Sequence, residues 1–543
     1  LRQPLSPTIV LLVNCYRRSH SRLFRSTQRQ TASHFSVGCS YPTYPLLCLP
    51  MFWFSKRRLT TGFFLAIATL YLVLALGWSK PANAVTARDY TELEFAPLGA
   101  IQILDFERYE QPNGMVVYLM EKHDLPIVSG SETFRAGEFM EPSDKTGLAA
   151  MTGEAMRVGG TVNYTPDELN QFLEQRAASV ETSLGATSGS ASFSTLSEDM
   201  ADVLSIFAEV IQQPAFAPDK IDLIKSQYRG SIARRNDDPD DVTTREFRKL
   251  IYGDESPFAR VVEYSDVESI SRDDVVNFYE TAIQPRGTIL GISGDFDSAQ
   301  MKSLIAEFFA DWSPSLGAKT SAEIPEVEQQ TNGLYVVDQP QLTQSYIHIG
   351  HLGGRLDSPD HASMVVLNEV LNGFGGRLFN DIRSRQGLAY VVYAFWSPRY
   401  DYPGLFIGGG QTRSEATVPF IETMYREIQR VRQEPITADE LQFAKDAVLN
   451  SFVFNFATPE QTLSRLIRYE YYGYPSDFVF KFQKAVESTT VEEVLEAAQR
   501  NLKPSDLVTI VVGNLDAIDP SLGTLAEEVK ITPIDIAIPE PSV

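Results

Sequence analysis

Cysteine is nearly absent from this chain, and its few cysteines all lie near one end. The 543 residues contain three, Cys15, Cys39 and Cys48. The sequence beyond residue 50 therefore has no thiol for a disulfide, a cysteine–zinc site or cysteine catalysis.

Positive charge is in deficit over most of the sequence. The whole chain carries 47 Lys and Arg against 70 Asp and Glu. The first 84 residues hold ten of the basic residues and no acidic one, which leaves 37 basic against 70 acidic residues, a balance of −33. We predict no nucleic-acid partner, because there is no basic excess to neutralise phosphates.

The N-terminal segment has the pattern of an export signal. Lys56-Arg57-Arg58 precedes an apolar run at 62–78, and Ala82-Asn83-Ala84 has the small residues of a cleavage site. We predict a signal peptide at 51–84 and a periplasmic or otherwise exported mature protein. The alternative is an uncleaved N-terminal anchor, which would then be the only membrane contact.

Residues 1–50 begin with Leu and precede a suitable start at Met51. We interpret them as a non-native or disordered extension, with a transit extension as the other interpretation. They are excluded from the prediction of the fold.

A tandem repeat organises the rest of the sequence. Pro285 recurs as Pro504, 219 residues later, and Lys225 recurs as Lys445 at an offset of 220. Gly-Asp-Phe-Asp from residue 294 likewise recurs as Gly-Asn-Leu-Asp from residue 513. A nearly constant offset over such distances indicates two homologous units.

We place the two domains at 87–318 and 333–533, joined by a linker at 319–332. Residue patterns predict strands at 115–119, 288–292, 334–337 and 507–512, and helices at 167–178, 200–212, 273–282 and 491–501. Helices come in blocks and do not strictly alternate with strands, which favours an α+β fold over a doubly wound sheet.

Several motifs carry a family resemblance. Pro112-Asn113-Gly114 leads into a strand, and Lys145-Thr146-Gly147-Leu148-Ala149 opens a helix. In the second half, Leu378-Phe379 and Ile382-Arg383 precede Gly387-Leu388-Ala389-Tyr390. In these motifs the chain resembles the M16 (insulinase/pitrilysin, mitochondrial processing peptidase-like) family of zinc metallopeptidases. The resemblance implies two domains, each an antiparallel sheet packed with helices, that form half of a clamshell.

The zinc motif of that family is degenerate here. Active members carry His-x-x-Glu-His, whose histidines lie one helical turn apart and bind zinc while the glutamate acts as general base. Aligned on the motif, the histidine positions hold Ala150 and Glu154, the base position holds Gly153, and the distal ligand position holds Ser231. The resemblance therefore predicts no intrinsic catalytic residue, no metal and no cofactor in this chain.

The remaining histidines offer no substitute zinc site. His348 and His351 are three residues apart in an apparent strand, so their side chains should point to opposite faces. We interpret these two, together with His123 and His361, as surface or loop-packed residues.

The resemblance assigns substrate binding to Arg383 and Tyr390. A guanidinium binds carboxylates or carbonyls with two donors, and a phenol donates a hydrogen bond to a carbonyl or oxyanion. The alternative is an Arg paired with an acid and a Tyr packed on the sheet. Gly373, Gly375 and Gly376 resemble a short form of the substrate-binding glycine-rich loop of non-catalytic processing-peptidase subunits, or simply form a turn that ends a helix.

Together these features predict a non-catalytic M16-like subunit. It would pair with a homologous zinc-bearing subunit, which would hold the zinc, and help bind short or unfolded peptides for metal-dependent endopeptidase cleavage. The alternative is a structural or binding protein of an envelope or membrane complex with no role in proteolysis.

Overall fold

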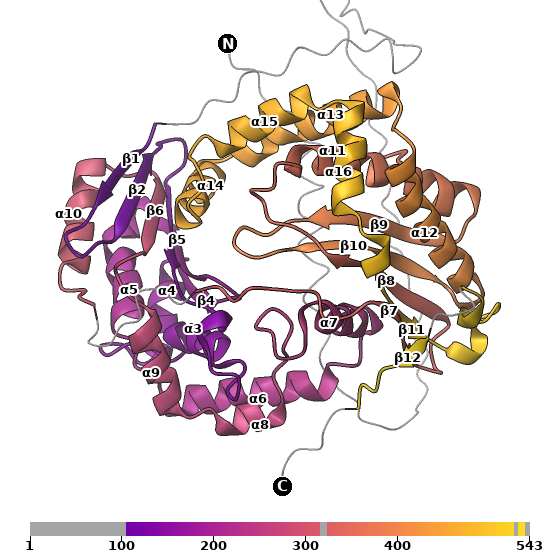
Figure 1. The fold of residues 1–543 in the computed structure, drawn as a ribbon. Coiled ribbons are helices and arrows are strands. Elements are labelled where there is room, and N and C mark those ends of the chain that lie inside the picture. Colours follow the sequence, from indigo (N-terminus) through magenta and orange to yellow (C-terminus); the bar gives the residue numbers. More distant parts are fainter. Residues whose placement is uncertain (1–104, 315–322, 526–529, 538–543) are drawn as a thin grey trace, which may run out of the picture. The chain divides into compact units, whose positions relative to one another are not determined.

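Each half of the chain is built around one six-stranded sheet (Figure 1). The structure is a computed structural model and describes residues 105–314, 323–525 and 530–537. The predicted extension at 1–50, the predicted signal peptide at 51–84 and the start of the predicted linker lie outside the described residues.

The first half contains the strands β1 (Glu107–Glu110), β2 (Val116–Glu121), β3 (Ile127–Phe134), β4 (Ser179–Leu184), β5 (Gly189–Leu196) and β6 (Ile289–Gly294). Its helices are α3 (Leu148–Val158), α4 (Pro166–Gln175), α5 (Met200–Gln212), α6 (Pro218–Arg234), α7 (Pro239–Tyr252), α8 (Tyr264–Ser269), α9 (Arg272–Ala282) and α10 (Ser298–Phe309).

The second half contains the strands β7 (Gly333–Asp338), β8 (Gln344–Leu352), β9 (Ala389–Ser397), β10 (Leu405–Arg413), β11 (Val508–Gly513) and β12 (Ile531–Pro533). Its helices are α11 (His361–Asn372), α12 (Thr417–Gln433), α13 (Ala438–Phe452), α14 (Pro459–Tyr471), α15 (Phe478–Ser488) and α16 (Val491–Asn501). A π-helix, labelled η4, spans Phe379–Arg385.

The strand orders are β1-β2-β6-β3-β5-β4 and β12-β7-β11-β8-β10-β9. The α+β class is confirmed, but each sheet is mixed and not antiparallel throughout. In each half an early strand lies beside a late one and runs parallel to it: β2 beside β6, and β7 beside β11. A parallel pair needs a long crossover, and the helices between these strands supply it.

The predicted elements are present in both halves. The four predicted strands correspond to β2, β6, β7 and β11, and the four predicted helices to α4, α5, α9 and α16. Helix α4 ends earlier than expected, and Ala177 beyond it has a φ of 48°, which a helix cannot accommodate. The repeat extends to side-chain contacts: Lys225 Nζ donates to Ile270 O at 2.9 Å, and Lys445 Nζ to Thr489 O at 2.9 Å.

Helices α7 and α14 each pack against the sheet of the other half. Phe247 and Ile251 of α7 share an apolar cluster with Ile510 of β11. Leu463 and Ile467 of α14 share one with β2 and β6. The two helices start at repeat-related prolines, Pro239 and Pro459. One face of each sheet is therefore covered by a helix that the opposite half supplies, while its other face packs on helices of its own half.

In the part of the chain that the structure describes, no helix is long and apolar enough to cross a membrane.

Glu132 is a fully buried carboxyl at the centre of β3, with 0% of its surface exposed. Neither carboxyl oxygen has a hydrogen-bond partner among the described residues. Burial raises the pKa of Glu132 well above its ordinary value of 4.5. The folded state therefore favours the neutral acid, since an unpaired buried charge is costly.

Glu132→Leu should stabilise the protein, and the gain should grow with pH. As pH rises above about 4.5, the unfolded chain loses this proton first, so the unfolding free energy falls until the folded-state pKa is passed. The loss amounts to about 1.4 kcal/mol per pH unit in that window. Urea unfolding at pH 5 and pH 8 measures this change in the free energy of unfolding. Glu132→Gln, which cannot titrate, should also remove the pH dependence; equal pH dependence in all three proteins would contradict this origin.

Candidate functional site

Helix α3 carries the degenerate zinc motif and is anchored at its start by a buried acid. Glu141 accepts hydrogen bonds from the N–H groups of Gly147 at 3.1 Å and Ala149 at 2.8 Å, and lies 2.9 Å from Arg260. These contacts satisfy helix-terminal donors that would otherwise be unpaired. Burial raises the pKa of Glu141, although the N–H groups and Arg260 favour its charged form. The helix is present and well held, even though its zinc chemistry is missing.

The position of the general base is closed by a neighbouring strand. A Cβ atom on Gly153 would lie 2.4 Å from the backbone N of Leu184 and 2.8 Å from the carbonyl carbon of Ser183, both in β4. Thr182 Oγ1 in the same strand donates to Gly153 O at 2.6 Å. Glycine is required here because the helix and strand backbones approach too closely for any side chain.

The other motif positions also fail to fit zinc. Ala150 has no donor atom, and Ser231 lies exposed on α6. Glu154 is partly buried, and burial raises its pKa, which disfavours the carboxylate form that a metal needs. No group of three His, Cys, Asp or Glu side chains within residues 105–314, 323–525 and 530–537 is arranged to hold a metal ion. The residues present do not fit the metal of active members.

Three of the four histidines predicted as surface or loop-packed residues lie instead in β8 and α11. His348 and His351 are buried in β8, where burial lowers the pKa of each to about 4. His361, at the start of α11, is half-buried, and this burial lowers its pKa to about 4 as well. Among the histidines that the structure describes, only His123 is exposed, and its contact with Asp295 at 2.6 Å raises its pKa. Side chains alternate between the two faces of a strand, which predicted opposite faces for His348 and His351. A single sequence does not reveal that both faces of β8 are covered, so the burial of these histidines could not be predicted.

Arg383 and Tyr390 lie together on the surface of the second half. The Arg383 guanidinium carbon is 4.4 Å from the centre of the Tyr390 ring and 4.8 Å from that of Phe379. Tyr390 is 77% exposed. Arg383 has no ion pair with any described residue, whereas Arg385, two residues on, lies 3.8 Å from Asp381. The structure therefore differs from the alternative in which Arg383 pairs with an acid and Tyr390 packs on the sheet.

The local backbone explains how the two side chains meet. Arg383 lies in the π-helix η4, a rare conformation that is frequent at functional sites. Tyr390 follows at the start of β9, beside an irregularity in the β9–β10 register at Gln411/Thr412. The π-helix and the irregular strand start thus hold an aromatic ring and a guanidinium face to face.

The glycine segment lies next to this pair. Gly373 ends α11, Gly375 has a φ of 86°, and Phe374 between them is 89% exposed. Phe374 contacts Phe379, on which Arg383 packs, with ring centres 5.8 Å apart. The segment therefore both terminates a helix and continues the exposed surface formed by Arg383 and Tyr390. Their role in substrate binding stays a prediction.

The outer edge of β9 is partly sealed by side chains. Asn372 exchanges two hydrogen bonds with the backbone of Ala394, at 2.6 and 2.8 Å, and Asn368 does the same with Trp396, at 3.0 and 2.8 Å. Side-chain amides one turn apart on α11 thus replace a neighbouring strand. Sequence reasoning missed this pair, although their spacing of four on one helix was visible.

Comparison with known proteins agrees with this geometry. A family model described as "Insulinase (Peptidase family M16)" matches residues 117–257, and one described as "Peptidase M16 inactive domain" matches residues 269–448. "Non-peptidase homolog YmxG" of Helicobacter pylori is 21% identical over 76% of this chain and 94% of that protein. "Uncharacterized zinc protease YmxG" of Bacillus subtilis is 22% identical over 63% of this chain and 78% of that protein.

Solved structures share the fold. The crystal structure of a peptidase M16 inactive domain from Pseudomonas fluorescens is similar with a TM-score of 0.69 and 23% identity, over 77% of this chain and 100% of that chain. The structure of a protease from Helicobacter pylori is similar with a TM-score of 0.64 and 16% identity, over 75% of this chain and 99% of that chain.

Proposed function

Because the chain belongs to the M16 peptidase family and is a homologue of its inactive members, we propose that it is a non-catalytic subunit that binds peptide for a zinc-bearing partner. The proposal includes export from the cytoplasm, zinc in the partner alone, and membrane contact only through the N-terminal segment.

One observation carries the proposal: the substrate-binding pair remains available where the zinc motif has been lost. Arg383 and Tyr390 contact each other at 4.4 Å, and Arg383 has no carboxylate partner among the described residues. A cation held against an aromatic ring keeps its charge and its hydrogen-bond donors. Such a pair is suited to accept a peptide, whereas an internally neutralised pair would be suited only to stabilise the fold.

The chemistry available to this chain is binding and orientation. The Arg383 guanidinium can donate two parallel hydrogen bonds to a peptide carboxylate or a single one to a backbone carbonyl. The Tyr390 phenol can donate to a second carbonyl oxygen. Neither step needs a metal in this chain, and α3 supplies no group that activates water.

The proposal predicts that activity requires two different chains. The purified protein alone should cleave no unfolded peptide and contain no stoichiometric zinc, because Ala150, Gly153, Glu154 and Ser231 replace the groups of the motif. Mixed with a zinc-bearing M16 homologue from the same cell, it should co-elute on sizing chromatography and raise cleavage of a fluorogenic peptide. Chelator-sensitive cleavage by this chain alone would contradict the proposal. Co-elution without any change in cleavage would support the structural alternative.

A further inference from the structure

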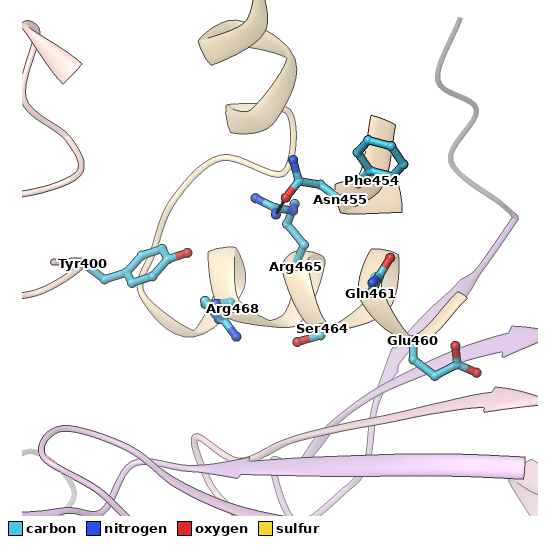
Figure 2. Close-up of a pocket in the computed structure, with 8 residues that line it drawn as sticks. All are labelled: Tyr400, Phe454, Asn455, Glu460, Gln461, Ser464, Arg465 and Arg468. Atoms are coloured by element: carbon cyan, nitrogen blue, oxygen red, sulfur yellow. Dashed lines mark hydrogen bonds between the residues drawn. The ribbon is translucent and has the colours of Figure 1, made fainter. Parts of the chain in front are cut away.

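A cavity of about 330 Å³ lies beside α14 and is lined by two arginines on one face of that helix. Arg465 and Arg468 are three residues apart and therefore neighbours on the helix surface. Figure 2 shows both with Ser464 between Tyr400 on one side and Glu460 on the other. The cavity combines cationic side chains with hydroxyl and amide groups.

Neither guanidinium is neutralised. Arg465 donates to Asn455 Oδ1 at 2.6 Å and to Tyr469 Oη at 3.3 Å, both neutral, while its Nε is buried with no hydrogen-bond partner among the described residues. The Arg468 side chain forms no ion pair or hydrogen bond with another described residue. Its guanidinium carbon lies 5.9 Å from the centre of the Tyr400 ring. Aromatic and neutral contacts orient a guanidinium and leave its charge uncompensated.

The one carboxylate that lines this cavity is too distant to compensate Arg468. Glu460 and Arg468 are eight residues apart on α14, which corresponds to about 12 Å along the helix axis. In Figure 2 Glu460 lies at the end of the row opposite Tyr400. A charge at such a distance at the protein surface is largely screened.

A second cavity, of about 290 Å³, adjoins the first and shares Ser464 and Arg468 with it. Its other walls include Ser131 and Thr133 of β3 and Tyr471 of α14. No Asp or Glu is among the described residues that line it. Hydroxyl donors around an unpaired guanidinium, with no competing acid, are the composition of a site for an anion.

We propose that Arg465 and Arg468 form a carboxylate-binding site that selects peptides bearing an acidic group, an inference that rests on the proposed function for the peptide itself. The carboxylate is either an Asp or Glu side chain or the C-terminus of the peptide. The chain has an overall charge of −23, so an unpaired pair of arginines is a local site of attraction for a carboxylate on a protein of net negative charge. Arg468 is the principal ligand, since it faces both cavities and is held by an aromatic ring.

The test measures binding of three fluorescent unfolded peptides to the full chain by anisotropy. One carries Glu with an amidated C-terminus, one carries Gln with a free C-terminus, and one carries Gln with an amidated C-terminus. A peptide with the preferred carboxylate should bind about 10- to 100-fold tighter than the neutral peptide, the usual effect of a charge-assisted contact. Which acidic peptide binds better identifies the source of the carboxylate.

Arg468→Gln should abolish this preference, so that the three peptides bind with similar affinity. Arg468→Lys should retain part of it, because the charge remains but the fork of donors is lost. Arg286→Gln is the matched control, since Arg286 is exposed, lies before β6 and has no ion pair among the described residues. It should leave the preference intact.

Equal binding of all three peptides, an acid preference that survives Arg468→Gln, or no peptide binding at all would overturn this site. Its failure is distinct from failure of the proposed function. Cleavage by the paired complex without acid preference would remove only the carboxylate site. An Arg468-dependent preference without paired cleavage would remove only the proteolytic role.

Discussion

Replacing Arg383 with alanine is expected to lower peptide cleavage by the paired complex by roughly 30- to 1,000-fold. Loss of one charge-assisted or oxyanion-type hydrogen bond costs about 2–4 kcal/mol in the transition state. Tyr390→Phe removes only the phenol hydroxyl and should produce a loss in the same range. Folding and assembly should be nearly unchanged, because Tyr390 is 77% exposed and Arg383 has no ion pair with any described residue to lose.

The double variant adds information about coupling. Arg383 packs on the Tyr390 ring at 4.4 Å, so loss of one side chain also loosens the other. The double substitution should therefore cost little more than the worse single one.

Arg385→Ala is the matched control for Arg383→Ala. It removes the same charge from the same π-helix, but Arg385 already lies beside Asp381 at 3.8 Å. The measurements are turnover of a fluorogenic peptide and sizing chromatography of each complex. If Arg383→Ala, Tyr390→Phe and Arg385→Ala all assemble and cleave at the unmodified rate, the substrate-binding role of the pair is wrong.

Gly153→Ala should destabilise the protein by about 1–2 kcal/mol. The added Cβ would lie 2.4 Å from the backbone N of Leu184, and backbone cannot yield as a flexible side chain can. Overpacking of this kind typically costs about 1–3 kcal/mol. The alanine also gains helix propensity of up to about 1 kcal/mol, so the net effect is a loss of stability as long as β4 cannot move away from α3. Urea unfolding measures the change.

Gly230→Ala is the control with opposite sign. Gly230 lies inside α6, and a Cβ there would meet nothing within 4 Å. The same substitution should therefore stabilise the protein by about 0.5–1 kcal/mol. A Gly153→Ala variant that is as stable as Gly230→Ala would show that β4 can move away from α3.

The same close contact should block restoration of the zinc motif. The triple variant Ala150→His, Gly153→Glu, Glu154→His supplies the residues of His-x-x-Glu-His, but the glutamate has no space beside β4. We expect poor folding or a protein without stoichiometric zinc. Metal analysis of a folded triple variant with one zinc per chain would contradict this expectation.

The sequence predicted the helices and strands whose residue patterns are local, and specific elements of the structure confirm this. Residue patterns identified β6 and β11, and helical spacing identified α5 and α16 with their bounds. The motif alignment identified the loss at Gly153, since residue type alone decides whether a general base is present.

Features that depend on distant parts of the chain could not be predicted. The apolar face of α14 was visible, but not that it would cover β2 and β6 of the other half. The apolar spacing of a helix shows that it needs a partner surface and does not specify which one. The sequence also could not show that Arg465 and Arg468 lack an ion pair, because a partner can come from residues far away in the sequence.

The exchange of α7 and α14 has an evolutionary consequence. A single repeat with this architecture would leave one apolar sheet face bare and one apolar helix without a surface. A lone ancestral copy would therefore have been stable only as a symmetric, domain-swapped dimer, with each copy lending its helix to the other. Gene duplication and fusion would then have turned an association between two molecules into an intramolecular one. After fusion the two copies could diverge, so that α3 and the segment with Arg383 and Tyr390 could change independently while the exchanged helices still held the two halves together.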